Sequence, residues 1–250
     1  MLKTRVMPTL LYKDFGLVKG LSFDSRRRVG SVMQAVKVYN LREVDELVFL
    51  DVTATLDGRD PDFELIDDIA DECFMPLTVG GGIRTEDHVR RLLQVGADRV
   101  LVNTAAVERP ELIRATADTF GTQCIAVSID ARRVGDGYEA LTHAGTRATA
   151  LDPVELARSA EANGAGEILL TSIDRDGTMT GYDVELVERV AQAVSIPLIA
   201  SGGAGTYEHM VEVLQAGASA VAAAAMFHYT ESTPLEAKRF LAASGVPVRL

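Results

Sequence analysis

Short apolar runs rich in valine, isoleucine and leucine recur along the chain, and longer amphipathic stretches lie between them. The longer stretches, such as DHVRRLLQ and VELVERVAQAV, carry apolar residues at i, i+3 and i+4, which predicts helices with one buried face. The short runs are apolar without alternation, as expected for parallel strands covered on both faces. Counting 5–11 as the first strand, about eight strand–helix units are predicted, with strands at 5–11, 46–51, 76–80, 99–103, 124–129, 167–171, 197–201 and 219–224.

The two halves of the chain resemble each other. MPLTVGGGI at 75–83 corresponds to IPLIASGGA at 196–204, so that Pro76 and Pro197 lie 121 positions apart. The match continues at the same offset through the following helical stretch, where TEDHVRRLLQVGA corresponds to TYEHMVEVLQAGA. A repeat near half the chain length indicates two similar structural units.

These patterns predict one domain, 1–250, folded as a (β/α)8 TIM barrel with a two-fold internal repeat of half-barrels, roughly 1–122 and 123–250. A doubly wound open sheet is the competing fold, and it predicts one glycine-rich nucleotide loop near the N-terminus. The glycine-rich loops here occur twice, in the middle of each half, which favours the closed barrel.

Composition narrows the class of partners. The formal net charge of −11 argues against nucleic acid and anionic membranes, while a local basic pocket for a phosphorylated substrate stays open. Cys73 and Cys124 belong to no CxxC or Cys/His cluster, so a zinc site is not expected. We also expect no other metal site and no cofactor. No apolar run approaches the ~18 residues of a membrane span, and we expect a soluble cytoplasmic protein.

The predicted strand ends carry the residues suited to chemistry, because barrel active sites lie at the C-terminal ends of the strands. GGGIRT and SGGAGT follow strands of the two halves and lead into helices. Backbone amides at such turns can approach a phosphate closely, and the following helix adds positive potential. Two clusters, each paired with a second small-residue loop (NTAAVERP and AAAAMF), predict a substrate with two phosphates, although glycines that only form tight turns are the alternative.

Asp130 closes the apolar run CIAVSID and is the main candidate for acid–base chemistry. A carboxylate among apolar walls at a catalytic strand end can have a raised pKa and transfer protons. The alternative is an ion pair with Arg132 or Arg133. His88 and His209 match across the repeat but fall on the helices, so we expect them to belong to the scaffold.

Together these strand ends resemble the cyclase subunit of imidazole glycerol phosphate synthase, from histidine biosynthesis. The resemblance runs from KDFGLVKG through DELVFLD, VGGGI, NTAAVE, SIDARR and ASGGAG, and GEILLTSIDRDGT is its most specific string. It implies a barrel that receives ammonia from a class I glutaminase docked at its N-terminal face. The ammonia would react at the other end with an intermediate that carries two phosphates.

The resemblance also implies roles for single residues. It implies catalysis by Asp130, with Asp51, Thr171 and Ser201 nearby and Lys19 on the first loop. It implies phosphate contacts from Gly82, Asn103, Thr104, Asp176, Gly177, Gly203, Ala224 and Ala225. An ammonia gate is implied at the barrel bottom, formed by Arg5, Glu46, Glu167 and Arg99, where the family usually has lysine at the last position, and Asp98 matches a position that faces the glutaminase.

One departure from the family pattern affects the expected reaction. The family carries two catalytic aspartates, at the ends of strands 1 and 5, and the first falls on Leu11. Leucine cannot transfer a proton, and the loop residue Asp14 matches a different aspartate of the family. LLYKDFGLVK, NLREVDEL and ECFMP resemble a paralogous branch that serves surface-polysaccharide synthesis, associated with converting an acetamido group of a nucleotide-linked sugar into an acetamidino group.

Three functions therefore stay open. The first is an ammonia-dependent synthase subunit acting on a substrate other than the histidine intermediate. The second is a genuine imidazole glycerol phosphate synthase subunit that tolerates Leu11. The third is a barrel without catalytic activity that binds phosphates and regulates its glutaminase.

Overall fold

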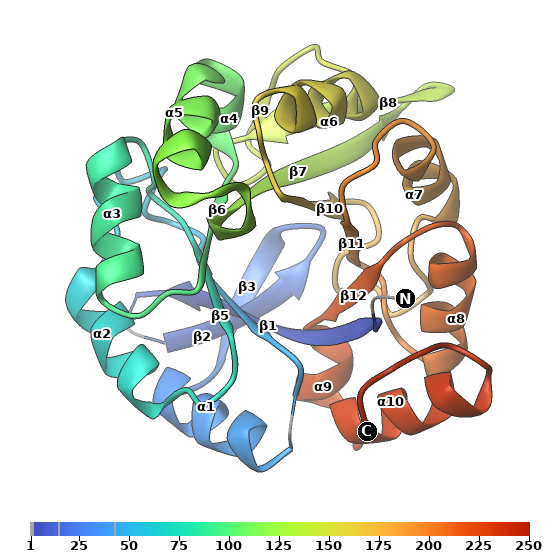
Figure 1. The fold of residues 1–250 in the computed structure, drawn as a ribbon. Coiled ribbons are helices and arrows are strands. Elements are labelled where there is room, and N and C mark those ends of the chain that lie inside the picture. The colour runs from blue at the N-terminus through green and yellow to red at the C-terminus, as the bar shows by residue number, and fades with distance from the viewer. Residues whose placement is uncertain (1–2, 15, 43) are drawn as a thin grey trace.

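Eight parallel strands close into a barrel, which confirms the predicted (β/α)8 fold. The computed structural model describes residues 3–14, 16–42 and 44–250. The strands follow one another in the order β10-β11-β12-β1-β4-β5-β6-β7, and pairing of β7 with β10 closes the ring. Figure 1 shows the helices surrounding this ring. The barrel strands are β1 (Arg5–Lys13), β4 (Leu47–Asp51), β5 (Leu77–Gly80), β6 (Arg99–Val102), β7 (Ile125–Val134), β10 (Glu167–Ser172), β11 (Leu198–Ser201) and β12 (Ala220–Ala223).

The outer helices begin at capping residues that repeat between the halves. The side chain of Asp62 accepts a hydrogen bond from the Leu65 amide, and Asp183, 121 positions later, accepts one from Leu186. Such caps satisfy amides that the first helical turn leaves unpaired. The surrounding helices are α1 (Val32–Leu41), α2 (Phe63–Glu72), α3 (Glu86–Gln94), α5 (Glu111–Phe120), α6 (Pro153–Ala162), α7 (Val184–Ala191), α8 (Tyr207–Gln215) and α10 (Pro234–Ala243).

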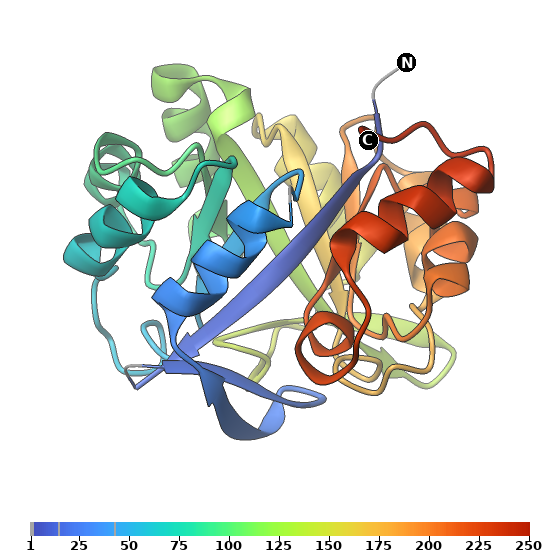
Figure 2. The same cartoon turned by 90° about the horizontal axis from the view of Figure 1, so that it is seen from below.

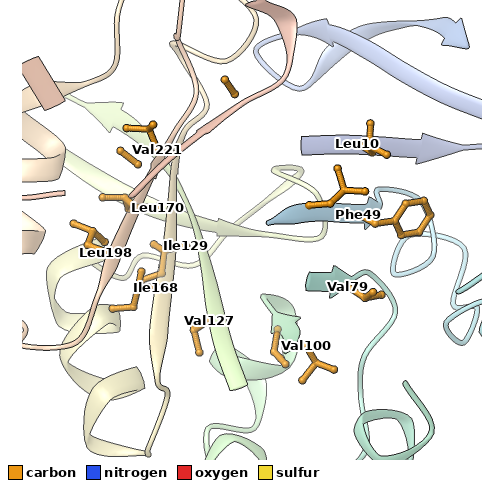
Figure 3. Packing of buried hydrophobic residues seen from close by; sticks show 14 of the residues in the cluster. Leu10, Phe49, Val79, Val100, Val127, Ile129, Ile168, Leu170, Leu198 and Val221 are labelled. Atoms are coloured by element: carbon orange, nitrogen blue, oxygen red, sulfur yellow. The ribbon is translucent and has the colours of Figure 1, made fainter. Parts of the chain in front are cut away.

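The core has two layers because strand side chains point alternately outward and inward. Figure 3 shows outward-facing residues, among them Leu10, Phe49 and Val127, in the layer between strands and helices. Inside the barrel, inward-facing side chains form an apolar inner layer of Met7, Val48, Leu101, Ala126, Leu169, Ile199, Ala220 and Ala222. Thr9 and Thr78, the strand partners of Val48, face inward at the same level. This inner layer separates the two ends of the barrel.

Two hairpins at the catalytic end differ from the sequence prediction. The segment expected as a loop after the first strand forms β2 (Gly16–Leu21) and β3 (Asp24–Gly30), and β7 continues past Ile129 to pair with β8 (Gly137–Thr142). These strands form because of their pairing partners and turns, and they contain no apolar run. The hydrophobic pattern of the sequence therefore did not predict them. Figure 2 shows the β2–β3 hairpin at the end opposite the C-terminus. The remaining elements are the short helices α4 (Thr104–Glu108), α9 (Ala225–Tyr229) and η1 (Thr122–Cys124), and strand β9 (Arg147–Ala148).

Candidate functional site

A cavity of about 430 Å³ opens at the C-terminal ends of the barrel strands. Residues from both halves of the chain line it, since every strand of the ring ends here. All thirteen residues that the sequence singled out for substrate or catalysis are among its lining residues: Lys19, Asp51, Gly82, Asn103, Thr104, Asp130, Thr171, Asp176, Gly177, Ser201, Gly203, Ala224 and Ala225.

Asp130 lies on the inward face of β7, close to the floor of this cavity. It is 8% exposed, and its carboxylate oxygens are 3.4 Å from Nδ2 of Asn103 and 3.5 Å from the Ser128 hydroxyl. The Arg133 side chain, one of the two alternative partners, binds Glu185 and the Tyr138 hydroxyl. The carboxylate thus faces a space large enough for a substrate.

Leu11 lines the cavity from the opposite wall, because β1 stands four strands away from β7 in the ring of eight. It is half-buried and pairs with Leu50 of β4. Asp14 is exposed at the turn after β1, outside the set of residues that line the cavity. The wall opposite Asp130 therefore presents a leucine and not a carboxylate.

An ion pair between Lys19 and Asp176 lies at one side of the cavity opening, which we call the mouth. The Lys19 ammonium, 1% exposed, donates to both carboxylate oxygens of Asp176 at 2.6 and 2.8 Å. The amide of Ser22, at the tip of the β2–β3 hairpin, donates to the Asp176 carbonyl at 2.8 Å. The hairpin is thus held against the loop after β10, and Lys19 neutralises a carboxylate that would otherwise repel a phosphate.

Asp51 organises the loop after β4. One carboxylate oxygen accepts from the amides of Thr53 and Ala54 at 3.0 Å, and the other is 3.3 Å from the Arg59 guanidinium. Although burial lowers the pKa of Arg59, the charge and hydrogen bond of Asp51 raise it above its usual value. Asp51 lines the cavity, and its carboxylate already accepts hydrogen bonds from the backbone of the loop after β4.

The two glycine-rich loops expected to bind phosphate have similar backbone geometry, with a left-handed glycine at Gly82 and at Gly203. Gly203 has φ +106°, and a Cβ there would lie 2.1 Å from the Gly181 carbonyl oxygen, so the turn requires glycine. Gly82, its repeat counterpart, also lines the cavity, and each loop stands beside a short helix whose first turn faces the mouth, α4 or α9. Glycine turns that lead into helix N-termini suit an anion, although the Gly82 amide here donates to the Thr55 hydroxyl at 3.3 Å.

His88 and His209 each contact the backbone of one of the two glycine-rich loops. Nδ1 of His88 lies 3.3 Å from the Gly82 carbonyl oxygen, and Nδ1 of His209 accepts from the Thr206 amide at 3.2 Å. Both histidines occupy the first turn of their helices, α3 and α8. The sequence placed them away from the site, but a helix that follows a barrel strand begins at the catalytic end.

The sequence also missed two arginines and a histidine at the mouth: Arg84, Arg109 and His143 line the cavity near the glycine-rich loop of the first half. The His143 amide donates to the Thr104 hydroxyl at 3.1 Å, and its backbone is left-handed, with φ +53°. The segment THAGT gives no sign that His143 adopts this conformation. Only the folded structure shows it, because a positive φ is uncommon for a residue other than glycine.

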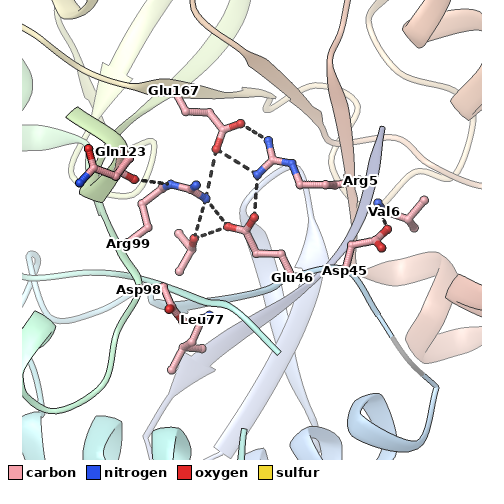
Figure 4. Close-up of polar contacts among 10 residues, drawn as sticks. Arg5, Val6, Asp45, Glu46, Leu77, Asp98, Arg99, Gln123 and Glu167 are labelled. Carbon is pink, nitrogen blue, oxygen red and sulfur yellow. Dashed lines mark hydrogen bonds and ion pairs between the residues drawn. The ribbon is translucent and has the colours of Figure 1, made fainter. Parts of the chain in front are cut away.

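At the other end of the barrel, four charged side chains form a ring under the apolar inner layer (Figure 4). Arg5 binds both Glu46 and Glu167, and Arg99 binds the same two carboxylates. Both glutamates are 3% exposed. Burial lowers the pKa of Arg5, but the hydrogen bonds and charges of Glu167 and Glu46 outweigh this effect, so that its pKa lies above the usual value. These are the four residues expected to form the gate.

Asp98 is exposed on this same face, where its carboxylate accepts from the Leu77 amide at 2.8 Å. Two large apolar side chains are each 86% exposed: Leu41, at the end of α1 ahead of β4, and Phe74, ahead of β5. Asn40 ties them together, donating to the Glu72 carbonyl and accepting from the Phe74 amide. Asn40 thus links the end of α1 to the segment before β5.

Within the described ranges, no helix is long and apolar enough to cross a membrane, and no group of three His, Cys, Asp or Glu residues is arranged to hold a metal ion. Cys73 and Cys124 are free and half-buried. Burial raises the pKa of the Cys73 thiol.

Comparison with known proteins agrees with this geometry. Residues 5–233 match the family model described as "Histidine biosynthesis protein". The chain is 50% identical over all 250 residues, and over 99% of the relative, to the protein named "Imidazole glycerol phosphate synthase subunit HisF" from Hyphomonas neptunium (strain ATCC 15444). The chain therefore belongs to the histidine biosynthesis protein family and is similar over its whole length to the synthase subunit HisF.

Proposed function

We propose that this protein is the synthase subunit of a class I glutamine amidotransferase complex and aminates a phosphorylated substrate with ammonia that passes through the barrel. The charged ring at one end, the apolar inner layer and the cavity at the other end support this proposal. Neutral ammonia can cross an apolar layer that excludes ions. The glutaminase would dock on the face that carries Asp98, Leu41 and Phe74, and we expect the complex to work in the cytoplasm.

The substrate that fits best is a nucleotide-linked acetamido sugar, converted to the acetamidino sugar of surface polysaccharides. In this reaction the ammonia nitrogen bonds to the acetamido carbon, the carbon–oxygen bond breaks, and the oxygen leaves as water without any change in oxidation state. Asp130 would accept a proton from the attacking nitrogen and return one to the departing oxygen. The phosphate loops at Gly82 and Gly203 would hold the diphosphate.

Leu11 is the observation that carries this choice. Closing an imidazole ring in the family reaction uses carboxylates from both walls, and the wall opposite Asp130 presents leucine. Loss of one acid–base group lowers such a rate by roughly 10²- to 10⁴-fold. Amidine formation needs the ammonia route and one proton-transfer group, and this chain retains both.

The second candidate is the imidazole glycerol phosphate synthase reaction itself, which the 50% identity to a HisF protein favours. An assay with the histidine-pathway intermediate and ammonium chloride separates the two candidates. We expect turnover far below an ordinary enzymatic rate; turnover at such a rate would assign the chain to histidine synthesis.

The third candidate, a regulatory barrel without its own chemistry, is tested with Asp130→Asn. This change keeps the shape of the side chain and the hydrogen bond to Asn103 available while removing the proton acceptor. In the complex with a glutaminase, supplied with a nucleotide-linked acetamido sugar, we expect product formation to fall roughly 10²- to 10⁴-fold. Unchanged product formation would favour the regulatory barrel.

A further inference from the structure

The hydroxyl of Thr9 is a buried polar group that the reaction proposed above does not use. Thr9 is 6% exposed, and among the described residues its Oγ1 is the one buried side-chain oxygen or nitrogen that has no hydrogen-bond partner. Leaving a buried hydroxyl unpaired destabilises a fold, and buried polar groups in native proteins are nearly always bonded. Thr9 lines the mouth cavity, so a bound molecule can supply the missing partner.

The neighbourhood of Thr9 explains why the hydroxyl is unpaired. Thr9 pairs with Val48 in the first half, and Ser128 pairs with Leu169, the counterpart of Val48 in the second half. In the second half the Ser128 hydroxyl has a carboxylate two residues further along its strand, at 3.5 Å. In the first half that position is Leu11, so the acceptor of the Thr9 hydroxyl is missing.

The wall around Thr9 is otherwise apolar. Leu11 lies above it on the same face of β1, Leu50 stands on the neighbouring strand β4, and Ala222 stands on β12 at the other side. All three line the same cavity. This combination of one neutral hydroxyl and several aliphatic groups fits a small uncharged group that has one hydrogen-bond acceptor and one methyl.

We propose that Thr9 binds the carbonyl oxygen of the substrate's acetamido group, with the acetamido methyl packed against Leu11, Leu50 and Ala222. This inference rests on the proposed function, which makes the acetamido carbon the reacting atom. The site lies across the barrel from Asp130 and directly above the apolar layer from which ammonia would emerge. Negative charge grows on the carbonyl oxygen as the nitrogen attacks, so the hydrogen bond from Thr9 strengthens in the transition state.

Binding of free acetamide tests the site without any turnover. The full chain, Thr9→Val and Thr9→Ser are each titrated with acetamide and followed by NMR at the amide signals of the mouth. Valine keeps the shape and removes the hydroxyl, while serine keeps the hydroxyl. We expect the wild type and T9S to bind acetamide and T9V to bind it several-fold to tenfold more weakly, the worth of one neutral hydrogen bond. Equal binding by T9V and the wild type would overturn the inference, and inorganic pyrophosphate, which should bind all three alike, is the control.

Thermal unfolding of the isolated chain gives a second readout. Removing an unpaired buried hydroxyl should raise the midpoint of T9V by roughly 2–4 °C, whereas a hydroxyl with a structural role would lower it. The rate is measured in the complex with a glutaminase, supplied with a nucleotide-linked acetamido sugar. We expect T9V to lower kcat by roughly 10²-fold with the KM for ammonium unchanged, and T9S to keep most of the wild-type rate. If the wild type shows no turnover of that sugar while acetamide binding still depends on the hydroxyl, the proposed function fails and the Thr9 site stands.

Discussion

At the scale of single residues, the chemistry proposed for the mouth rests on two positions that face each other across the barrel. Asp130 occupies one wall, next to the hydroxyl of Ser128. Leu11 occupies the other, next to the unpaired hydroxyl of Thr9. A change of one side chain therefore alters both the proton-transfer capacity of the site and the hydrogen bonding of its neighbour.

Leu11→Asp tests whether the lost carboxylate alone separates this chain from the histidine reaction. The new side chain would face the open cavity and could accept from Thr9, as Asp130 accepts from Ser128. We expect the variant to gain ammonium-dependent ring closure of the histidine-pathway intermediate by roughly 10²-fold or more over the wild type. Leu11→Asn, which has similar shape and no proton-transfer group, is the matched control. Equal rates for L11D and L11N would show that other residues define the reaction.

At the scale of elements, the β2–β3 hairpin is closed over the mouth by contacts with the loop after β10. Gly177 in that loop has φ +76°, and a Cβ there would lie 2.2 Å from the Gly20 carbonyl oxygen. The hairpin backbone can therefore approach this closely only when residue 177 is glycine. The same approach brings Lys19 to Asp176.

Gly177→Ala should push the hairpin away from the mouth. Gly135→Ala is the control, because Gly135 also has positive φ, +58°, but nothing lies within 4 Å of the added methyl. Both variants pay the cost of a left-handed alanine, about 1 kcal/mol, and only G177A also clashes. We expect faster tryptic cleavage at Lys19 and Arg27 and lower substrate affinity in G177A alone. Cleavage rates that match between the two variants would mean that the hairpin does not depend on this contact.

Helix α9 contributes a pH-sensitive contact to the same region. Burial lowers the pKa of His228 and outweighs the hydrogen bond to the Thr9 carbonyl, 3.5 Å away, which raises it; the charge of Lys19 adds a smaller lowering effect. The unfolded chain therefore binds a proton more readily than the folded chain. Stability from His228 is fully present above the ordinary pKa of 6.5 and is lost as the pH falls towards the folded value.

His228→Asn should weaken this dependence. We expect the unfolding temperature of the wild type to fall more steeply than that of the variant between pH 8 and pH 5.5. Calorimetry in buffers of matched ionic strength measures both slopes. Parallel curves for the two proteins would exclude His228 as a source of acid sensitivity.

At the scale of the whole molecule, the barrel separates two surfaces of different character. One end carries the charged ring with Leu41 and Phe74 on its rim, and the other end carries the substrate cavity. The apolar inner layer lies between them. The proposed passage of ammonia would cross this layer from the first end to the second.

Phe74→Asp and Leu41→Asp test the docking face. Both side chains are 86% exposed, so the changes should leave the unfolding temperature nearly unchanged. We expect each to weaken binding of the glutaminase by roughly tenfold or more, as for other apolar residues at the centre of an interface. Val134→Asp, an exposed apolar residue of the hairpin at the opposite end, is the control and should leave binding unchanged. The affinities are measured by calorimetry with the purified glutaminase.

The sequence by itself determined the barrel and the identity of its strand ends. Parallel strands covered on both faces must be apolar throughout, and this pattern, repeated at an offset of 121, leaves few architectures open. The residues at the strand ends then converge at one mouth as a consequence of closure, so Asp130, Gly82 and Gly203 could be grouped before the structure was known.

Only the tertiary structure decided which of those groups are already engaged and which are free. Asp51 is bound by its own loop, Lys19 is bound by Asp176, and the hydroxyl of Thr9 is left without a partner. These outcomes depend on distances between side chains from strands far apart in the sequence, which periodicity does not encode. Periodicity did not predict the β2–β3 hairpin either, because strand pairing depends on a partner and a turn more than on the strand's own residues.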